Sequence, residues 1–123
     1  MKLVVDAEVI FASLIARGFT LQLIKVLSDL DIELLSPEYV FEEINKRKDK
    51  ILKFSGLNDV QLHFVISIIF ENIKTVKIEE YVEYMEEAKN LAPHERDIPY
   101  FALALAKNCA IWSNEKAFKN NKK

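Results

Sequence analysis

Short apolar runs alternate along this chain with longer segments of helical periodicity, and this alternation limits the fold more than any other feature. The runs contain β-branched residues and are too short to be helices. Such runs are typical of strands buried on both faces of a parallel sheet, with helices between them in the sequence. We therefore expect an α/β fold, a small parallel sheet flanked by helices on both faces, with strands at Leu3–Val5, Ile32–Leu35, Val76–Ile78 and Ala110–Ser113.

The segments between these runs carry helical signals. Gly18 separates the first two of them, each of which has apolar residues three and four positions apart. Ser36 and Pro37 are typical of a helix start, so we expect the third helix to begin with Ser36 as its N-cap. The expected helices are Glu8–Ala16, Leu21–Leu30, Ser36–Arg47, Leu57–Ile69, Glu79–Ala88 and Ile98–Lys107, of which the last is apolar all round and therefore expected to be buried.

Composition excludes several classes of protein. The 123 residues predict one domain over 1–123, and two glycines are too few to line a phosphate-cradling loop. The single cysteine, Cys109, cannot form an internal disulfide. One cysteine and two separated histidines do not have the spacing of a zinc finger. A Cys–His nucleophile stays open as a minor alternative. No stretch reaches 18 uncharged apolar residues, and Asp6 and Glu8 interrupt the segment that resembles a signal peptide. We therefore expect a cytoplasmic protein that contacts no membrane.

Charge is distributed unevenly, although its balance is nearly neutral. The formal net charge of −2 gives no support to nucleic-acid binding by itself. Basic residues concentrate in 46–53 and 107–123, whereas acids concentrate in 79–87, which we interpret as the solvated face of a helix. The many Ile, Lys and Glu residues, with only two Gln, favour a thermophile.

Four carboxylates are expected to meet in such a fold. The carboxyl ends of parallel strands lie at one edge of a sheet, where open α/β sheets bind their ligands. Asp6 follows the first expected strand, Glu115 follows the last, and Asp97 opens the apolar helix. Asp97 has an alternative role, of about equal weight, as the N-cap of that helix.

The fourth carboxylate is on the third helix, where two neighbouring acids have to be distinguished. Val40, Phe41 and Ile44 are expected to form the buried stripe of this helix. At 100° per residue, Glu43 flanks that stripe and Glu42 points nearly opposite to it. Glu43 is therefore the better candidate ligand.

Four segments of the chain resemble one family. VVDAEVIFASLIA, SPEYVFEEI, ERDIPYFALALA and IWSNEKAF, in this order and spacing, are similar to the PIN domain, a small α/β fold associated with metal-dependent ribonucleases. The resemblance covers nearly the whole chain. In PIN domains an Asp ends the first strand, a Glu lies on a later helix, an Asp opens a further helix and another acid follows the next strand. Asp6, Glu43, Asp97 and Glu115 match these positions.

The resemblance implies a site for Mg²⁺ or Mn²⁺. Phosphodiester cleavage needs an activated water and neutralised charge on the attacking and leaving oxygens, and hard cations that supply both prefer carboxylate ligands. By the resemblance, Asp6, Glu43 and Asp97 would hold one ion. Glu115 and Ser113 would support a second ion or a bound water.

This sequence departs from the family pattern in three places. The first motif usually reads Asp-x-Asn and here reads Asp6-Ala7-Glu8, so that Glu8 either joins the metal cluster or points into solvent. The last acid is usually Asp and here is Glu115. PIN domains also continue into a final edge strand, which we expect to be absent here or to lie beyond Lys123.

The leading hypothesis is an endoribonuclease that hydrolyses single-stranded RNA. Lys46, Arg47, Lys48 and Lys116 are candidate phosphate contacts, with solvated surface as their alternative role. The resemblance also implies a homodimer, and aromatic residues beyond what one small core needs, such as Phe64, Phe70, Tyr81 and Tyr84, favour it too. The resemblance leaves open whether the protein is a processing nuclease or a toxin with a cognate inhibitor protein. A catalytically weak or inactive PIN-like module that binds RNA or a protein is the second hypothesis. A receiver-type signalling domain fits poorly, because the expected second strand lacks an acceptor Asp.

Overall fold

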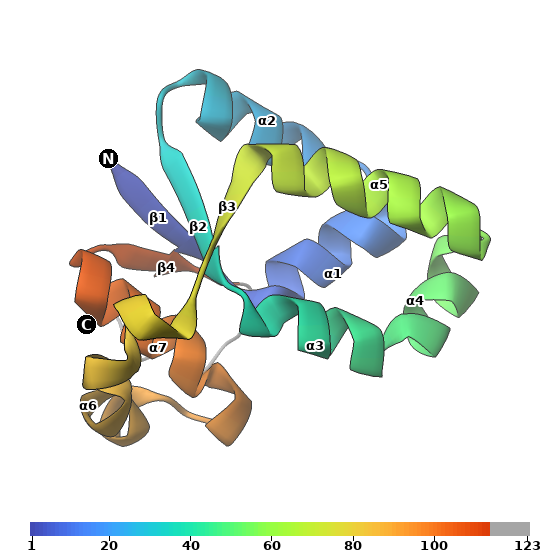
Figure 1. Cartoon of the computed structure of the whole chain (residues 1–123). Coiled ribbons are helices and arrows are strands. Elements are labelled where there is room, and N and C mark those ends of the chain that lie inside the picture. The colour runs from blue at the N-terminus through green and yellow to red at the C-terminus, as the bar shows by residue number, and fades with distance from the viewer. Residues whose placement is uncertain (114–123) are drawn as a thin grey trace.

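The computed structural model describes residues 1–113, and it contains one four-stranded sheet (Figure 1). The strands are β1 (Lys2–Val5), β2 (Glu33–Pro37), β3 (Ile73–Val76) and β4 (Ala110–Trp112). Their order across the sheet is β3-β2-β1-β4, and every neighbouring pair is parallel. The predicted fold class is confirmed.

Parallel pairing brings the carboxyl ends of the two central strands together. Val4 of β1 lies opposite Leu35 on one side and Ile111 on the other. Two hydrogen bonds extend this register past the strand ends: Asp6 N–H donates to the carbonyl of Trp112 at 3.0 Å, and Ser36 Oγ donates to the carbonyl of Val5 at 3.3 Å. The residue after β1 is thereby held between the ends of β2 and β4.

Helices cover both faces of the sheet (Figure 1). One layer consists of α1, α2 and α5, with α3 and α4 continuing from it, and the other consists of α6 and α7. In chain order the helices are α1 (Ala7–Ala16), α2 (Phe19–Asp29), α3 (Tyr39–Lys46), α4 (Lys48–Ser55), α5 (Asp59–Asn72), α6 (Met85–Leu91) and α7 (Ile98–Lys107), with 3-10 turns η1 (Ile78–Glu80), η2 (Val82–Tyr84) and η3 (Glu95–Asp97).

The predicted start of the third helix is wrong. Ser36 and Pro37 are the last residues of β2, and α3 begins at Tyr39 after Glu38. The hydroxyl of Ser36 is used in the sheet, where it bonds to Val5, and so it does not cap the helix. The Ser-Pro pair is a local signal, and a contact with a strand 31 positions away in sequence overrides it.

Other elements also differ from the prediction. The third strand is Ile73–Val76, because α5 continues to Asn72 and the strand follows it directly. The expected acidic helix is two 3-10 turns followed by α6, and α4 was not predicted at all.

The core lies between the sheet and these two helical layers. Val4, Val5, Leu34 and Leu35 contribute to it from the central strands. As predicted, α7 is deeply packed. The apolar segment 57–69 also favours a largely buried helix, but α5 buries fully only Leu62 and Ile69, so that expectation is wrong. Among residues 1–113, no helix is long and apolar enough to cross a membrane.

Candidate functional site

Asp6 is the buried centre of the carboxyl edge. It directly follows β1, serves as the N-cap of α1 and is 2% exposed. Its Oδ2 accepts hydrogen bonds from the backbone N–H of Glu8 at 3.3 Å and from Ser113 Oγ at 3.4 Å. Burial raises the pKa of Asp6 to about 7, the Glu8 N–H opposes this rise, and the nearby carboxylates of Asp97 and Glu8 add to it.

Asp97 lies close enough to Asp6 to raise its pKa, although the two are far apart in sequence. It is the last residue of η3, immediately before α7, and it is 3% exposed. Its side chain makes no capping hydrogen bond to α7, so the alternative role as a side-chain N-cap is not observed. A buried carboxylate at this position faces other acids, which is typical of a cation site.

Glu43 reaches the same region from α3 and is joined to α7. Glu43 is 5% exposed, and its Oε1 accepts a hydrogen bond of 2.5 Å from the hydroxyl of Tyr100. Burial raises the pKa of Glu43, while the Tyr100 hydroxyl, Arg47 and Arg96 oppose the rise. The phenol pKa of Tyr100 is strongly raised, chiefly by burial and then by the charges of Glu43 and Asp6. Tyr100 therefore bonds to one predicted ligand, Glu43, and lies near enough to a second, Asp6, for its charge to raise the phenol pKa.

The helical angle correctly predicted which of the two neighbouring acids on α3 is buried: Glu43 is buried and Glu42 is exposed. Phe41 was expected in the buried stripe but is 42% exposed. Its ring packs against the ring of Phe70, with the two centroids 4.8 Å apart. The stripe is therefore narrower than predicted.

Glu8 is paired with a cation at the edge of the site, and its place in the metal cluster stays a prediction. It is half-buried and forms an ion pair with Arg47, with 3.2 Å between Oε1 and Nη1. The guanidinium of Arg47 also lies over the ring of Phe11, 4.9 Å from its centroid. Arg47 thus holds Glu8 at the rim of the acidic site.

The other residues predicted to contact RNA have different surroundings. Lys46 is exposed at the end of α3, and its ammonium lies 5.9 Å from the centroid of the Tyr39 ring. Lys48 forms an ion pair of 2.7 Å with Asp59 at the start of α5. Glu115 and Lys116 lie outside the described residues.

Two hollows of about 460 and 500 Å³ adjoin this region and share Tyr39, Met85 and Pro99. Arg96 lines the first hollow. The Tyr39 ring makes an edge contact with Tyr100, with the ring centroids 6.4 Å apart. An aromatic side chain and a cation therefore lie beside the buried acids.

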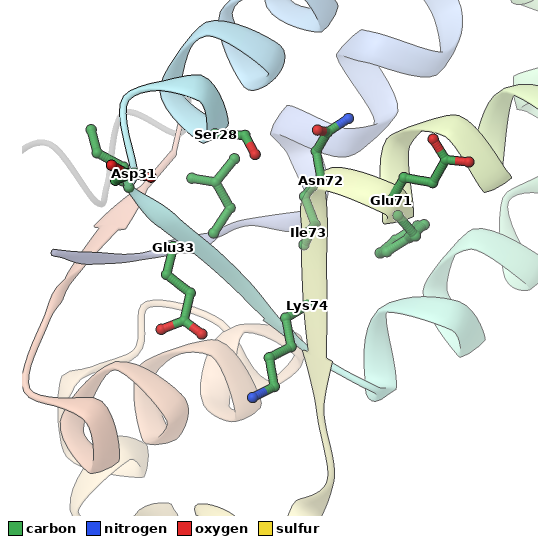
Figure 2. A pocket seen from close by; sticks show the side chains of 10 residues that line it. Ser28, Asp31, Glu33, Glu71, Asn72, Ile73 and Lys74 are labelled. Atoms are coloured by element: carbon green, nitrogen blue, oxygen red, sulfur yellow. The ribbon is translucent and has the colours of Figure 1, made fainter.

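A further hollow of about 360 Å³ lies at the opposite, amino edge of the sheet, as Figure 2 shows. Ser28, Asp31, Glu33, Glu71, Asn72 and Lys74 contribute its polar lining. Asp31, Glu33 and Glu71 are all exposed. This edge has acids but no buried carboxylate, and we do not assign it to the site.

The donors at the carboxyl edge fit a hard divalent cation by their chemistry. Asp6, Glu43 and Asp97 are buried carboxylates, and Asp97 and Glu8 raise the pKa of Asp6 by repulsion that a cation would relieve. Within residues 1–113, no three His, Cys, Asp or Glu side chains are already grouped to hold one ion. The assignment of Asp6, Glu43, Asp97 and Glu115 to a metal therefore stays a prediction.

Sequence reasoning missed Tyr100 and Arg96, and it gave Arg47 a different role. Tyr100 is three residues after Asp97 and therefore lies on the same side of the first turn of α7. That spacing was a signal in the sequence, although the partner of Tyr100 on α3 was not.

Comparisons with known proteins agree with this architecture. A family model of the PIN domain matches residues 4–121. Among solved structures, the chain is similar to one in the crystal structure of VapBC2 from Rickettsia felis bound to a DNA fragment from their promoter. That match has a TM-score of 0.76 and 14% identity, and it covers 99% of this chain and 94% of the other. At this identity the likeness shows the fold alone, and no curated protein matches the sequence.

Proposed function

This chain belongs to the PIN domain family, and we propose on that basis that it is a metal-dependent endoribonuclease hydrolysing phosphodiester bonds of single-stranded RNA. PIN domains are generally nucleases, and these nucleases generally depend on divalent metal ions. The observation that carries the proposal is the burial of Asp6, Glu43 and Asp97 at one edge of the sheet. Burying three carboxylates is costly unless a cation compensates their charges.

In this proposal Asp6, Glu43 and Asp97 bind Mg²⁺ or Mn²⁺, while Glu115 and Ser113 support a second ion or a bound water. When bound, the cation supplies an activated water and neutralises charge on the attacking and leaving oxygens. Ser113 holds Asp6 through the bond to Oδ2, and the ion pair with Arg47 keeps Glu8 at the rim.

Lys46 is the best supported of the proposed RNA contacts, with Lys116 proposed from the sequence alone. Lys46 is exposed, whereas Arg47 and Lys48 are engaged with Glu8 and Asp59. An exposed cation beside an aromatic ring suits a single strand, whose phosphates need positive charge and whose bases stack.

We also propose two protein partners and a cytoplasmic location. The structural match is to a chain of VapBC2, which supports a toxin role with a cognate inhibitor protein. Val60 and Phe64 on α5 are 79% and 67% exposed, and this supports a homodimer through that surface. Tyr81, which the sequence also offered for a dimer, is 3% exposed and belongs to the core. A light-scattering mass of one chain at micromolar concentration would count against the dimer.

The test of function is cleavage of a fluorescent single-stranded RNA by the full chain with Mn²⁺, with Mg²⁺ and with chelator. Single-stranded DNA and duplex RNA of the same sequence are the comparison substrates. We expect cleavage of the single-stranded RNA that the chelator abolishes. Cleavage that persists in chelator would contradict the mechanism, and no cleavage of any RNA would favour the inactive binding module.

A further inference from the structure

Tyr100 is the side chain that joins two of the proposed metal-binding helices. It is fully buried, and its hydroxyl donates the 2.5 Å hydrogen bond to Glu43 Oε1, which lies 57 positions earlier in the sequence. The bond links the first turn of α7 to the middle of α3. Asp97 and Tyr100, three residues apart, therefore place an acid and a phenol on the same side of one helix start.

The phenol has little freedom to leave this position. The Tyr100 ring has no exposed surface, and the Tyr39 ring packs edge-on against it with an interplanar angle of 70°. A hydroxyl on a fixed ring is a directional donor, and hydrogen bonds to ionised acceptors are among the stronger ones in proteins. Glu43, by contrast, has a flexible side chain that would otherwise have to be ordered by the cation itself.

We propose that Tyr100 is a positioning residue of the metal site, because its hydroxyl fixes the Glu43 carboxylate by one oxygen and leaves the other oxygen for a divalent cation. This inference rests on the proposed function. Carboxylates that bind metals are themselves hydrogen-bonded in many proteins, and removing such an outer partner typically weakens metal binding about 10-fold to 100-fold. Tyr100 acts through Glu43 and does not touch the cation or the RNA.

The test uses the full chain and measures Mn²⁺ binding directly, from the loss of the free-ion signal in electron paramagnetic resonance. The variant is Tyr100→Phe, which keeps the ring and removes only the hydroxyl. The matched control is Tyr81→Phe, which removes the hydroxyl of another buried tyrosine. We expect Tyr100→Phe to weaken Mn²⁺ binding at least about 10-fold, and Tyr81→Phe to bind as the wild type does.

A double-mutant cycle with Glu43→Gln separates positioning from packing. If Tyr100 acts through Glu43, adding Tyr100→Phe to Glu43→Gln leaves the remaining Mn²⁺ affinity unchanged. This comparison also serves if Tyr100→Phe alone does not fold, because the glutamine background has no buried charge facing the missing hydroxyl. An equal further loss in the double variant would overturn the inference.

The outcomes for the inference and for the proposed function are distinguishable. Wild-type protein that binds no Mn²⁺ would overturn the proposed metal dependence and the inference with it. Wild-type protein that binds Mn²⁺ and cleaves RNA, with both unchanged in Tyr100→Phe, would overturn the inference alone.

Discussion

The two edges of the sheet contain the same kinds of side chain and differ in what surrounds them. At the carboxyl edge, Asp6, Glu43 and Asp97 are at most 5% exposed. Ser113 donates a hydrogen bond to Asp6, and Tyr100 donates one to Glu43. At the amino edge, Asp31, Glu33 and Glu71 line an open hollow and are exposed to water (Figure 2). The difference teaches that burial and oriented donors, and not the number of acids, give an acidic cluster its chemistry.

The largest expected effect is a loss of RNA cleavage that occurs on substitution at the carboxyl edge and not at the amino edge. Asp97→Asn at the carboxyl edge keeps the shape of the side chain and removes the negative charge of a proposed ligand. We expect metal-dependent cleavage to fall about ten-thousandfold, equivalent to about 5 kcal/mol of transition-state stabilisation. The rate constant for cleavage of single-stranded RNA at saturating Mn²⁺ is the measurement.

The matched controls are Glu33→Gln at the amino edge and Glu42→Gln, whose side chain is exposed next to Glu43 on α3. Both should cleave at the wild-type rate, because neither carboxylate is buried. A similar loss in Asp97→Asn and in either control would remove the distinction between the edges.

The second prediction concerns stability without metal and depends on the raised pKa of Asp6. In the unfolded chain this carboxyl ionises near its ordinary value of 3.8, and in the folded protein it ionises at about 7. Between these values the folded state binds more protons than the unfolded state, so the free energy of unfolding falls as pH rises through this window. The total fall from this group is up to about 4 kcal/mol.

Asp6→Asn should remove this fall. The metal-free variant is expected to be more stable than the wild type at pH 8 and to show a flatter dependence of stability on pH between 4 and 7, measured by urea unfolding in chelator. Asp31→Asn at the amino edge is the control and should retain the wild-type slope. Parallel pH profiles for Asp6→Asn and the wild type would show that neither burial nor the neighbouring carboxylates raise the pKa of Asp6.

The sequence predicted those parts of the fold whose signals are local. The bounds of α7, Ile98–Lys107, are confirmed, because an acid and a proline mark its start and its apolar residues continue to its end. The angle along α3 also predicted correctly that Glu43 is buried and Glu42 exposed.

What the sequence could not predict depends on contacts between distant segments. Ser36 looks like an N-cap until the neighbouring strand presents the carbonyl of Val5 to it. The ion pair of Glu8 could not be predicted either, because its partner Arg47 lies 39 positions away. Tyr100 likewise reads as one apolar residue of a buried helix, since nothing near it in sequence indicates Glu43.

The third prediction concerns RNA affinity on the two sides of the α3–α4 junction. Lys46→Ala should weaken binding of single-stranded RNA a few-fold and lower the slope of log affinity against log salt concentration by about 0.7, the value for one lost phosphate contact. Lys50→Ala, on the exposed side of α4, should change neither quantity. A fluorescence anisotropy titration at several salt concentrations, on the cleavage-deficient Asp97→Asn protein, measures both. Equal effects of the two substitutions would point to general electrostatic attraction and not to a defined contact.

The smallest expected effect concerns Glu8, the acid at the rim of the carboxyl edge. Its ion pair with Arg47 is partly exposed, with side-chain exposures of 37% and 38%, and such pairs contribute at most about 1 kcal/mol to stability. Glu8→Gln should therefore lower the free energy of unfolding by less than about 1 kcal/mol, and it should leave cleavage within about threefold of the wild type, since a rim charge affects transition-state stabilisation weakly. The same urea and cleavage measurements apply. A loss comparable to that of Asp97→Asn would place Glu8 among the metal ligands, because only a group that holds the cation accounts for several orders of magnitude in rate.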